Sequence, residues 1–233
     1  MSTDSWQAFY YGAWQQPWAL LVAPFAFVVW RAASAAPGPG AVPEARAFVL
    51  RWSAVFVALA MLDPIATGAL AKALGGGGIG TALGLGFVLL GDFRIWWLVL
   101  GLRDPRTGLP RAALATAAVP IFAWLATQAF AAARGPLPDQ ALWLIHESAF
   151  LVLAIVLARR QPAGFPRAVL AYAAVYYALW AACDVLILAS VDAGWLLRCL
   201  PNQLYYGLTV PYVWWRFFAP AYAETSSSTQ ASR

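Results

Sequence analysis

Residues 79–102 read IGTALGLGFVLLGDFRIWWLVLGL. Asp92 and Arg94 are the charged side chains in this stretch, and most of the others are apolar. An α-helix rises about 1.5 Å per residue, so a helix of this length spans roughly 36 Å. The hydrocarbon core of a bilayer is about 30 Å thick. The stretch therefore predicts a helix that crosses a membrane.

Comparable segments recur along the 233 residues, which are 62% hydrophobic and 11% charged, far below the roughly 25% charge of soluble domains. Turn-forming stretches at 37–40, 75–78, 103–106, 135–138 and 162–166 separate them. We predict an all-α polytopic membrane protein, a bundle of seven transmembrane helices formed by residues 1–220, with a disordered polar tail at 221–233. The predicted spans are about 13–33, 50–73, 79–102, 111–133, 140–158, 168–190 and 195–218.

The basic residues predict the orientation of this bundle. With the amino terminus outside and the carboxyl terminus in the cytosol, the outer side receives Lys72, Arg134 and Arg198. The cytoplasmic side receives a much larger set, as the positive-inside rule requires. That set is Arg31, Arg46, Arg51, Arg103, Arg106, Arg111, Arg159, Arg160, Arg167, Arg216 and Arg233. The net charge of +5 is therefore interpreted as membrane orientation rather than nucleic-acid binding, and we expect a bacterial inner membrane.

The sequence argues against several kinds of site. Its one histidine, His146, cannot form a zinc site of two or three histidines, and we expect no metal or cofactor. It contains no P-loop and no credible dinucleotide-binding glycine pattern. Cys183 and Cys199 both fall in apolar segments, where they are either two buried thiols or a disulfide.

Two features of the backbone carry expectations. Pro64, directly after Asp63, removes a helical hydrogen bond and can kink the second span. Gly80, Gly84 and Gly86 are interpreted as sites of close helix packing.

Aromatic side chains gather near the predicted span ends, where tryptophan and tyrosine anchor helices at the membrane interface. The predicted anchors are Tyr10, Tyr11, Trp14, Trp18, Trp30, Trp52, Trp195, Trp214 and Trp215. Trp124, Trp143 and Trp180 fall within spans instead, four residues before Gln128, Glu147 and Asp184 respectively. Residues four apart share a helix face, so these indoles either line a pocket for a cationic ligand or a carbocation-like transition state, or match by chance.

Ionisable groups inside the spans are costly and usually face a bundle interior or a wet cavity. Polar groups from five helices, ionisable and amide side chains together, fall at one depth, roughly 8–15 Å from the outer end of their spans. We therefore predict one polar pocket in the outer half of the membrane, which takes a lipophilic small molecule or a membrane lipid. The groups at this depth are Asp63, Gln128, His146, Glu147, Asp184, Asn202 and Gln203.

The three carboxylates at this depth repel one another if all are ionised, so one is expected to stay protonated and to serve as a general acid. We predict Asp63 or Asp184 as the proton donor, with Glu147 and His146 as the base and its orienting partner. Asp92 and Arg94 are either an interhelical ion-pair lock or functional. The predicted substrate-binding residues are Asp92, Trp124, Gln128, Trp143, Trp180, Asn202, Gln203 and Tyr206.

Several short motifs resemble the seven-helix integral-membrane terpene cyclases. They are Ala60-Met61-Leu62-Asp63, Leu89-Leu90-Gly91-Asp92, and Gln203-Leu204-Tyr205-Tyr206-Gly207 followed by aromatics and Arg216. The resemblance implies an intramembrane acid–base enzyme that acts on an isoprenoid or other lipid. In that family a span-2 glutamate and a last-span aspartate act in protonation and cyclisation. Asp63 matches the first, whereas the second appears as Asn202 or Gln203, which cannot donate a carboxylic proton.

Other interpretations stay open. Gly84-Leu85 through Gly91-Asp92, together with Ala182-Cys183-Asp184, is similar to the lysoplasmalogenases, which implies a lipid hydrolase. The Lys-Pro of that family appears here as Asp63-Pro64, and its Ser-His is absent. Carboxylates at mid-membrane beside a proline also fit a small proton-coupled transporter. A seven-helix sensor or a subunit of a larger complex is a further alternative, and the oligomeric state is not predicted.

Overall fold

The computed structural model describes residues 5–11, 43–70, 73–75 and 77–218, and this part of the chain is helical apart from its turns. The predicted span at 13–33 and the predicted tail at 221–233 lie outside the described residues. Five helices are long and apolar enough to cross a membrane, and they overlap the second to sixth predicted spans, although the first of them, Glu44–Thr67, begins and ends six residues before the predicted 50–73. The prediction of a multi-span all-α protein is confirmed to that extent.

The five long helices are α3 (Pro43–Pro64), α5 (Gly77–Arg103), α6 (Pro105–Arg134), α7 (Asp139–Arg160) and α8 (Phe165–Leu188). A π-helical turn, η2 (Ile65–Leu70), extends α3 directly after Pro64, where we expect a change in helix geometry because proline lacks an N–H group. The segment predicted as the last span is divided into α9 (Ala193–Leu197), α10 (Cys199–Asn202), the π-helical turn η3 (Gln203–Leu208) and α11 (Thr209–Phe218). A short helix, α1 (Trp6–Tyr10), precedes them.

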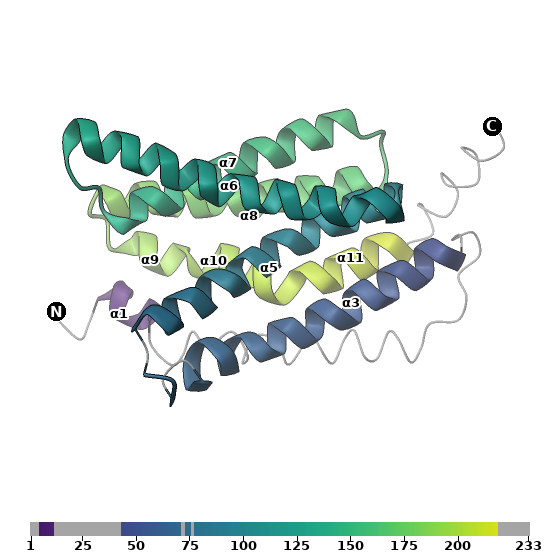
Figure 1. Ribbon diagram of the computed structural model, residues 1–233, viewed down its shortest axis with the longest axis horizontal. Helices are drawn as coiled ribbons and strands as arrows, with labels where there is room; N and C mark the ends of the chain where they lie inside the picture. Colours follow the sequence, from purple (N-terminus) through teal and green to yellow (C-terminus); the bar gives the residue numbers. More distant parts are fainter. Residues whose placement is uncertain (1–4, 12–42, 71–72, 76, 219–233) are drawn as a thin grey trace.

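The long helices run alternately up and down the bundle (Figure 1). One layer holds α6, α7 and α8, and the other holds α3, α5 and α11. The turns after α5 and α7 and the end of α11 lie at one end of the bundle, and α1 and α9 lie at the opposite end. The arginines of those turns, such as Arg103, Arg106 and Arg160, are therefore concentrated at the end remote from α1.

The turn between α5 and α6 is fixed by a helix cap. The Asp104 carboxylate accepts hydrogen bonds from the backbone N–H groups of Arg106 (3.0 Å) and Thr107 (3.4 Å). It also accepts one from the Thr107 hydroxyl at 2.5 Å. These hydrogen bonds, that of the Thr107 hydroxyl above all, hold the pKa of the Asp104 carboxyl below its usual value. The cap lets the chain reverse at once into α6.

The core is unusually aromatic. Its largest fully buried side chains include Trp52, Trp96, Trp214, Tyr176, Tyr177, Tyr205 and Phe150. The Trp52 indole donates to the Arg94 carbonyl oxygen at 2.9 Å, and the Trp214 indole donates to the Ser53 hydroxyl at 2.7 Å. The prediction that Trp52 and Trp214 are interfacial anchors is therefore wrong, because both rings join helices inside the bundle.

Close helix packing uses other glycines than those predicted. A Cβ atom added at Gly108 would lie 2.6 Å from the Cα atom of Gly101, so α5 and α6 touch backbone to backbone where they leave their turn. A Cβ atom at Gly84 or Gly86 would meet nothing within 4 Å among the described residues. The packing role predicted for these two glycines is therefore not seen among the described residues, and the predicted span at 13–33 lies outside them.

We expect Gly108→Ala to lower the free energy of unfolding by about 1–3 kcal/mol, because the backbones of α5 and α6 must separate to admit the methyl group. Gly84→Ala is the matched control, since it adds the same methyl group to α5 where no described residue lies within 4 Å, and it removes a helical glycine. Thermal unfolding of both variants in detergent measures the difference. Equal melting temperatures for the two variants would show that the Gly101–Gly108 contact does not limit the stability of the protein.

Candidate functional site

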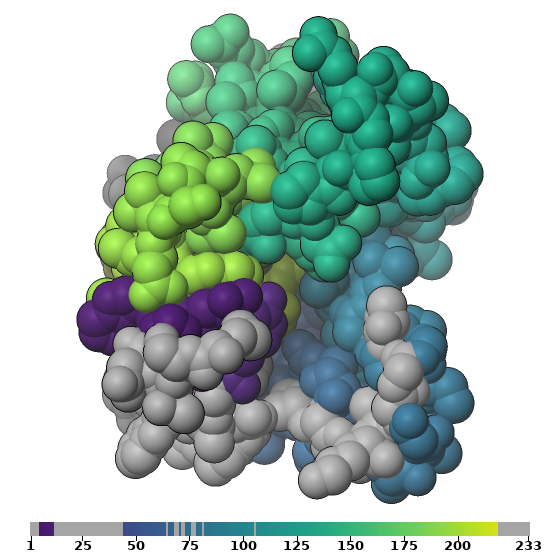
Figure 2. Space-filling model, turned by 90° about the vertical axis from the view of Figure 1, so that its left-hand side faces the viewer, coloured from purple at the N-terminus to yellow at the C-terminus, as the bar shows by residue number. Residues whose placement is uncertain are grey.

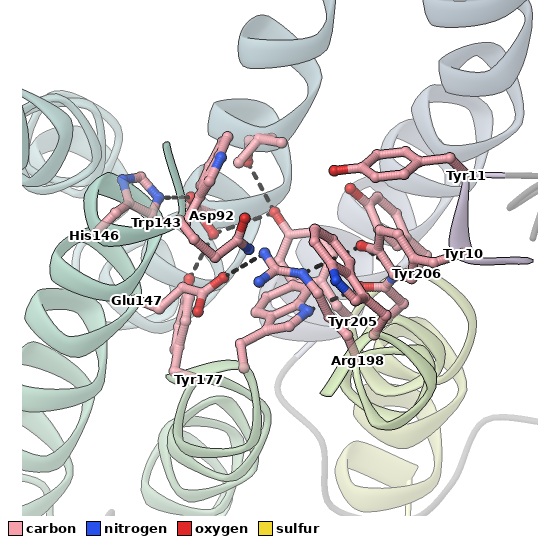
Figure 3. A pocket seen from close by; sticks show the side chains of 15 residues that line it. Tyr10, Tyr11, Asp92, Trp143, His146, Glu147, Tyr177, Arg198, Tyr205 and Tyr206 are labelled. Carbon is pink, nitrogen blue, oxygen red and sulfur yellow. Dashed lines mark hydrogen bonds and ion pairs between the residues drawn. The ribbon is translucent and has the colours of Figure 1, made fainter. Parts of the chain in front are cut away.

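A cavity of about 220 Å³ lies at the end of the bundle that carries α1 (Figure 3). Figure 2 looks onto this end and shows α1 beside α9, with a hollow between α1 and the long helices. The residues that line the cavity are Tyr10, Tyr11, Val88, Asp92, Gln140, Trp143, His146, Glu147, Tyr177, Trp180, Trp195, Arg198, Asn202, Tyr205 and Tyr206. Helices far apart in the sequence thus place aromatic and ionisable side chains around one space.

Asp92 of α5 is the centre of one polar cluster. Its Oδ1 atom accepts a hydrogen bond from the Tyr177 hydroxyl at 2.6 Å and lies 3.2 Å from the Tyr205 hydroxyl. Its Oδ2 atom lies 3.3 Å from His146 Nε2. These contacts join α5 to α7, α8 and η3 through one carboxyl group, and they fix the orientation of the His146 imidazole.

Gly91 permits this arrangement. A Cβ atom at Gly91 would overlap the ring and hydroxyl of Tyr205, so another residue there would push Tyr205 away from α5. With glycine in place, the Tyr205 hydroxyl reaches the Val88 carbonyl oxygen at 2.8 Å as well as Asp92. Gly91 therefore leaves room for the Tyr205 ring, and Asp92 contributes the carboxylate that the Tyr205 hydroxyl contacts.

Arg198 is the centre of the second polar cluster. It is 8% exposed, and its Nη2 atom donates to Glu147 Oε1 at 2.9 Å. Its Nη1 atom pairs with the Asp184 carboxylate, to which Gln140 also donates at 2.8 Å. One guanidinium thus faces two carboxylates. Glu147 is 3% exposed, and its Oε2 atom has no hydrogen-bond partner among the described residues.

Aromatic rings enclose the two clusters on the side of α1. Tyr10 and Tyr11 pack against Trp195, each with ring centroids 5.4 Å apart. The Tyr10 hydroxyl accepts hydrogen bonds from Arg198 Nε at 3.3 Å and from Asn202 Nδ2 at 3.1 Å. The Trp180 indole donates to Asn202 Oδ1 at 2.8 Å. The short helix α1 is thereby attached to the same residues that hold the carboxylates.

The structure does not place all the predicted acids in one pocket. Asp63 is 8% exposed and lines a separate cavity of about 20 Å³ with Arg94, Tyr205 and Tyr206. The Thr67 hydroxyl donates to the Asp63 carbonyl oxygen at 2.8 Å. Asp184 is buried in its ion pair with Arg198 and does not line the cavity. Neither of the predicted proton donors, Asp63 and Asp184, therefore lines the large cavity.

The ion-pair lock predicted for Asp92 and Arg94 takes a different form. Arg94 donates to the Tyr205 carbonyl oxygen and lies 3.3 Å from the Thr209 hydroxyl. Its guanidinium carbon also lies 4.2 Å from the Tyr205 ring centroid. Arg94 thus holds the π-helical turn η3 to α5, while Asp92 contributes to the cavity.

Of the predicted substrate-binding residues, Asp92, Trp143, Trp180, Asn202 and Tyr206 line the cavity, as do His146 and Glu147. Trp124 is 56% exposed, and Gln128 is also exposed, both on α6. The prediction that these two line the pocket is wrong, because the face of α6 that carries them points away from the bundle. Gln203 is half-buried and does not line the cavity either.

Several site residues were not predicted as such. They are Tyr10, Tyr11, Gln140, Tyr177, Trp195, Arg198 and Tyr205. The sequence places Arg198 among the outer charges, because it lies in the first turn of the predicted span at 195–218. Tyr10, Tyr11 and Trp195 were explained as interfacial anchors, and their sequence positions gave no indication that they meet.

Comparison with known proteins finds no matching family model, no matching curated protein and no matching solved structure. Within the described residues, no group of three or more His, Cys, Asp or Glu side chains could hold a metal ion. Cys183 and Cys199, which are both described, are not joined by a disulfide. The site is therefore interpreted from its own geometry.

We expect Arg198→Met to lower the free energy of unfolding by about 3–5 kcal/mol, because it leaves Glu147 and Asp184 buried without their counter-ion. Arg134→Met is the matched control, since Arg134 lies exposed at the end of α6. Thermal and denaturant unfolding in detergent compare the two variants. If Arg198→Met is as stable as Arg134→Met, the guanidinium does not hold the cluster together.

Proposed function

We propose that the chain crosses a bacterial inner membrane seven times, with the amino terminus outside and the cavity in the outer half of the bilayer. The distribution of arginines supports this orientation, because the end of the bundle remote from the cavity carries most of them. The five long apolar helices supply five of these spans. Residues 13–33 and the broken helical segment from α9 to α11 supply the others.

Two fusions test the orientation in a bacterial host. A green fluorescent protein fused after Arg233 is expected to fluoresce, because that end lies in the cytosol. Alkaline phosphatase fused after Arg134 is expected to be active, because this enzyme needs the oxidising outer side. The reverse pattern of fluorescence and phosphatase activity would contradict the orientation.

We further propose that the protein is an intramembrane acid–base enzyme that isomerises or cyclises an isoprenoid or other unsaturated lipid. The observation that carries this proposal is the unpartnered Oε2 atom of Glu147, which is buried at the wall of an aromatic cavity beside the Asp92–His146 pair. Burying a carboxyl oxygen without a hydrogen-bond partner costs free energy. A substrate that supplies the missing partner explains why a carboxyl group stands at this position.

The geometry gives each group a role. Arg198 faces two carboxylates, so Glu147 can hold a proton on Oε2 while Asp184 keeps the ion pair. Glu147 then gives this proton to an unsaturated carbon of the substrate, which leaves a positive charge on the substrate. The Asp92–His146 pair, in which Oδ2 lies 3.3 Å from Nε2, accepts the proton that the substrate loses from another carbon. Electrons and protons balance without an external oxidant or reductant.

The size of the cavity limits what enters it. A volume of about 220 Å³ is below the roughly 300–1,000 Å³ of pockets that enclose a drug-sized ligand. One ring or the reacting end of a lipid fits, and the rest of an isoprenoid chain must extend beyond α1 or between helices into the bilayer. A lipid hydrolase that relies on Asp184 is less well supported, because Arg198 and Gln140 engage that carboxylate.

We expect Glu147→Gln to lower kcat by a factor of about 100 or more, because the amide cannot transfer a proton. Glu44→Gln is the matched control, since Glu44 is exposed near the start of α3 at the opposite end of the bundle. Purified protein in lipid nanodiscs is incubated with unsaturated and epoxidised isoprenoids, and the products are followed by mass spectrometry. Turnover by Glu147→Gln at the rate of Glu44→Gln would remove Glu147 from the mechanism.

A further inference from the structure

The buried ionisable groups of the described residues do not balance in charge. Four carboxyl groups, those of Asp63, Asp92, Glu147 and Asp184, are buried. The buried basic groups are the guanidinium groups of Arg94 and Arg198 and the imidazole of His146. Even with His146 protonated, the carboxyl groups exceed the positive charges by one. Unbalanced charge is expensive in a medium of low dielectric constant, so the interior favours one further proton or cation.

The excess lies at the large cavity rather than at the small one. The small cavity brings one carboxyl group, Asp63, together with one guanidinium, Arg94. The large cavity is lined by the carboxyl groups of Asp92 and Glu147, and its one guanidinium, Arg198, is shared with Asp184 behind the wall. Glu147 Oε2 is the carboxyl oxygen there that has no partner among the described residues and can accept a new hydrogen bond.

Aromatic side chains form much of the remaining cavity wall. Three tryptophans and five tyrosines line it. They are Trp143, Trp180, Trp195, Tyr10, Tyr11, Tyr177, Tyr205 and Tyr206. The faces of indole and phenol rings attract cations, and the attraction grows where water is excluded. A carboxyl oxygen that lacks a donor, placed inside an aromatic wall, is complementary to a group that is positively charged, carries N–H bonds and has an apolar body.

We propose that the cavity binds a protonated amine with an apolar body, whose N–H group donates to the ionised Glu147 Oε2 and takes the place of the proton that this oxygen holds before it reacts. The inference rests on the proposed function, because a site that stabilises positive charge on a reacting lipid also binds a stable cation of similar size. It extends that function by assigning the cavity to cationic, ammonium-bearing ligands or inhibitors, in preference to neutral ones of the same shape.

The experiment compares benzylammonium with benzyl alcohol, which has nearly the same size but no charge. Isothermal titration calorimetry and the shift in melting temperature measure the binding of each to the full chain in detergent. We expect benzylammonium to bind at least 10-fold more tightly than benzyl alcohol. We expect Glu147→Gln to weaken benzylammonium binding about 10-fold or more and to leave benzyl alcohol unaffected, because hydrogen bonds to charged groups are the stronger ones.

Glu44→Gln is the control for the loss of one carboxylate, and it is expected to bind benzylammonium as the unaltered protein does. If Glu147→Gln does not fold, the affinities of the unaltered protein for the two ligands still decide whether the cavity prefers a cation. Equal affinity for benzylammonium and benzyl alcohol would overturn the inference, as would an equal loss of benzylammonium binding in Glu44→Gln. Both results leave the acid–base proposal standing, since that proposal is tested by turnover.

Discussion

Arg198 is buried inside the helical bundle, and two carboxylates from different helices compensate its charge. This arrangement is the constraint on which the site depends. Glu147 on α7 and Asp184 on α8 are held to the start of the broken last segment through one guanidinium. Because a buried charge without its counter-ion costs several kcal/mol, these three elements can meet in few other ways. The position of the cavity follows from that meeting.

The Asp92 cluster is held together by packing as much as by charge. Gly91 lets Tyr205 approach α5, and the approach brings the tyrosine hydroxyl to Val88 and Asp92. Arg94, two residues further along α5, holds the backbone of the same tyrosine. One short stretch of α5 therefore positions η3 through both the side chain and the backbone of Tyr205. The motif Gly91-Asp92-Phe93-Arg94 packs α5 against η3. The Asp92 carboxylate is the part of this motif that lines the cavity.

The short helix α1 covers the cavity on one side, and it is attached through the Arg198 cluster. Tyr10 accepts hydrogen bonds from Arg198 and Asn202, and the Trp6 backbone N–H donates to Asp192 at 2.8 Å. The same guanidinium thus fixes the acids and the aromatic edge of the cavity. A ligand that competes for Arg198 would also affect α1, which links occupancy of the cavity to the arrangement of its mouth.

The sequence by itself determined the class of fold. Apolar stretches of the length of 79–102 leave a chain few ways to satisfy its backbone except as membrane-crossing helices. It also identified buried ionisable residues, since a carboxylate such as Glu147 within an apolar helix needs a partner wherever the helix packs. Which partner it takes was decided by the tertiary structure. Depth along a helix can be read from the sequence, but the rotation of each helix about its axis cannot, because that angle is set by packing against neighbours. For this reason Gln128 and Glu147, assigned to one depth, face opposite environments, and Arg198, assigned to the outside, lies between two acids.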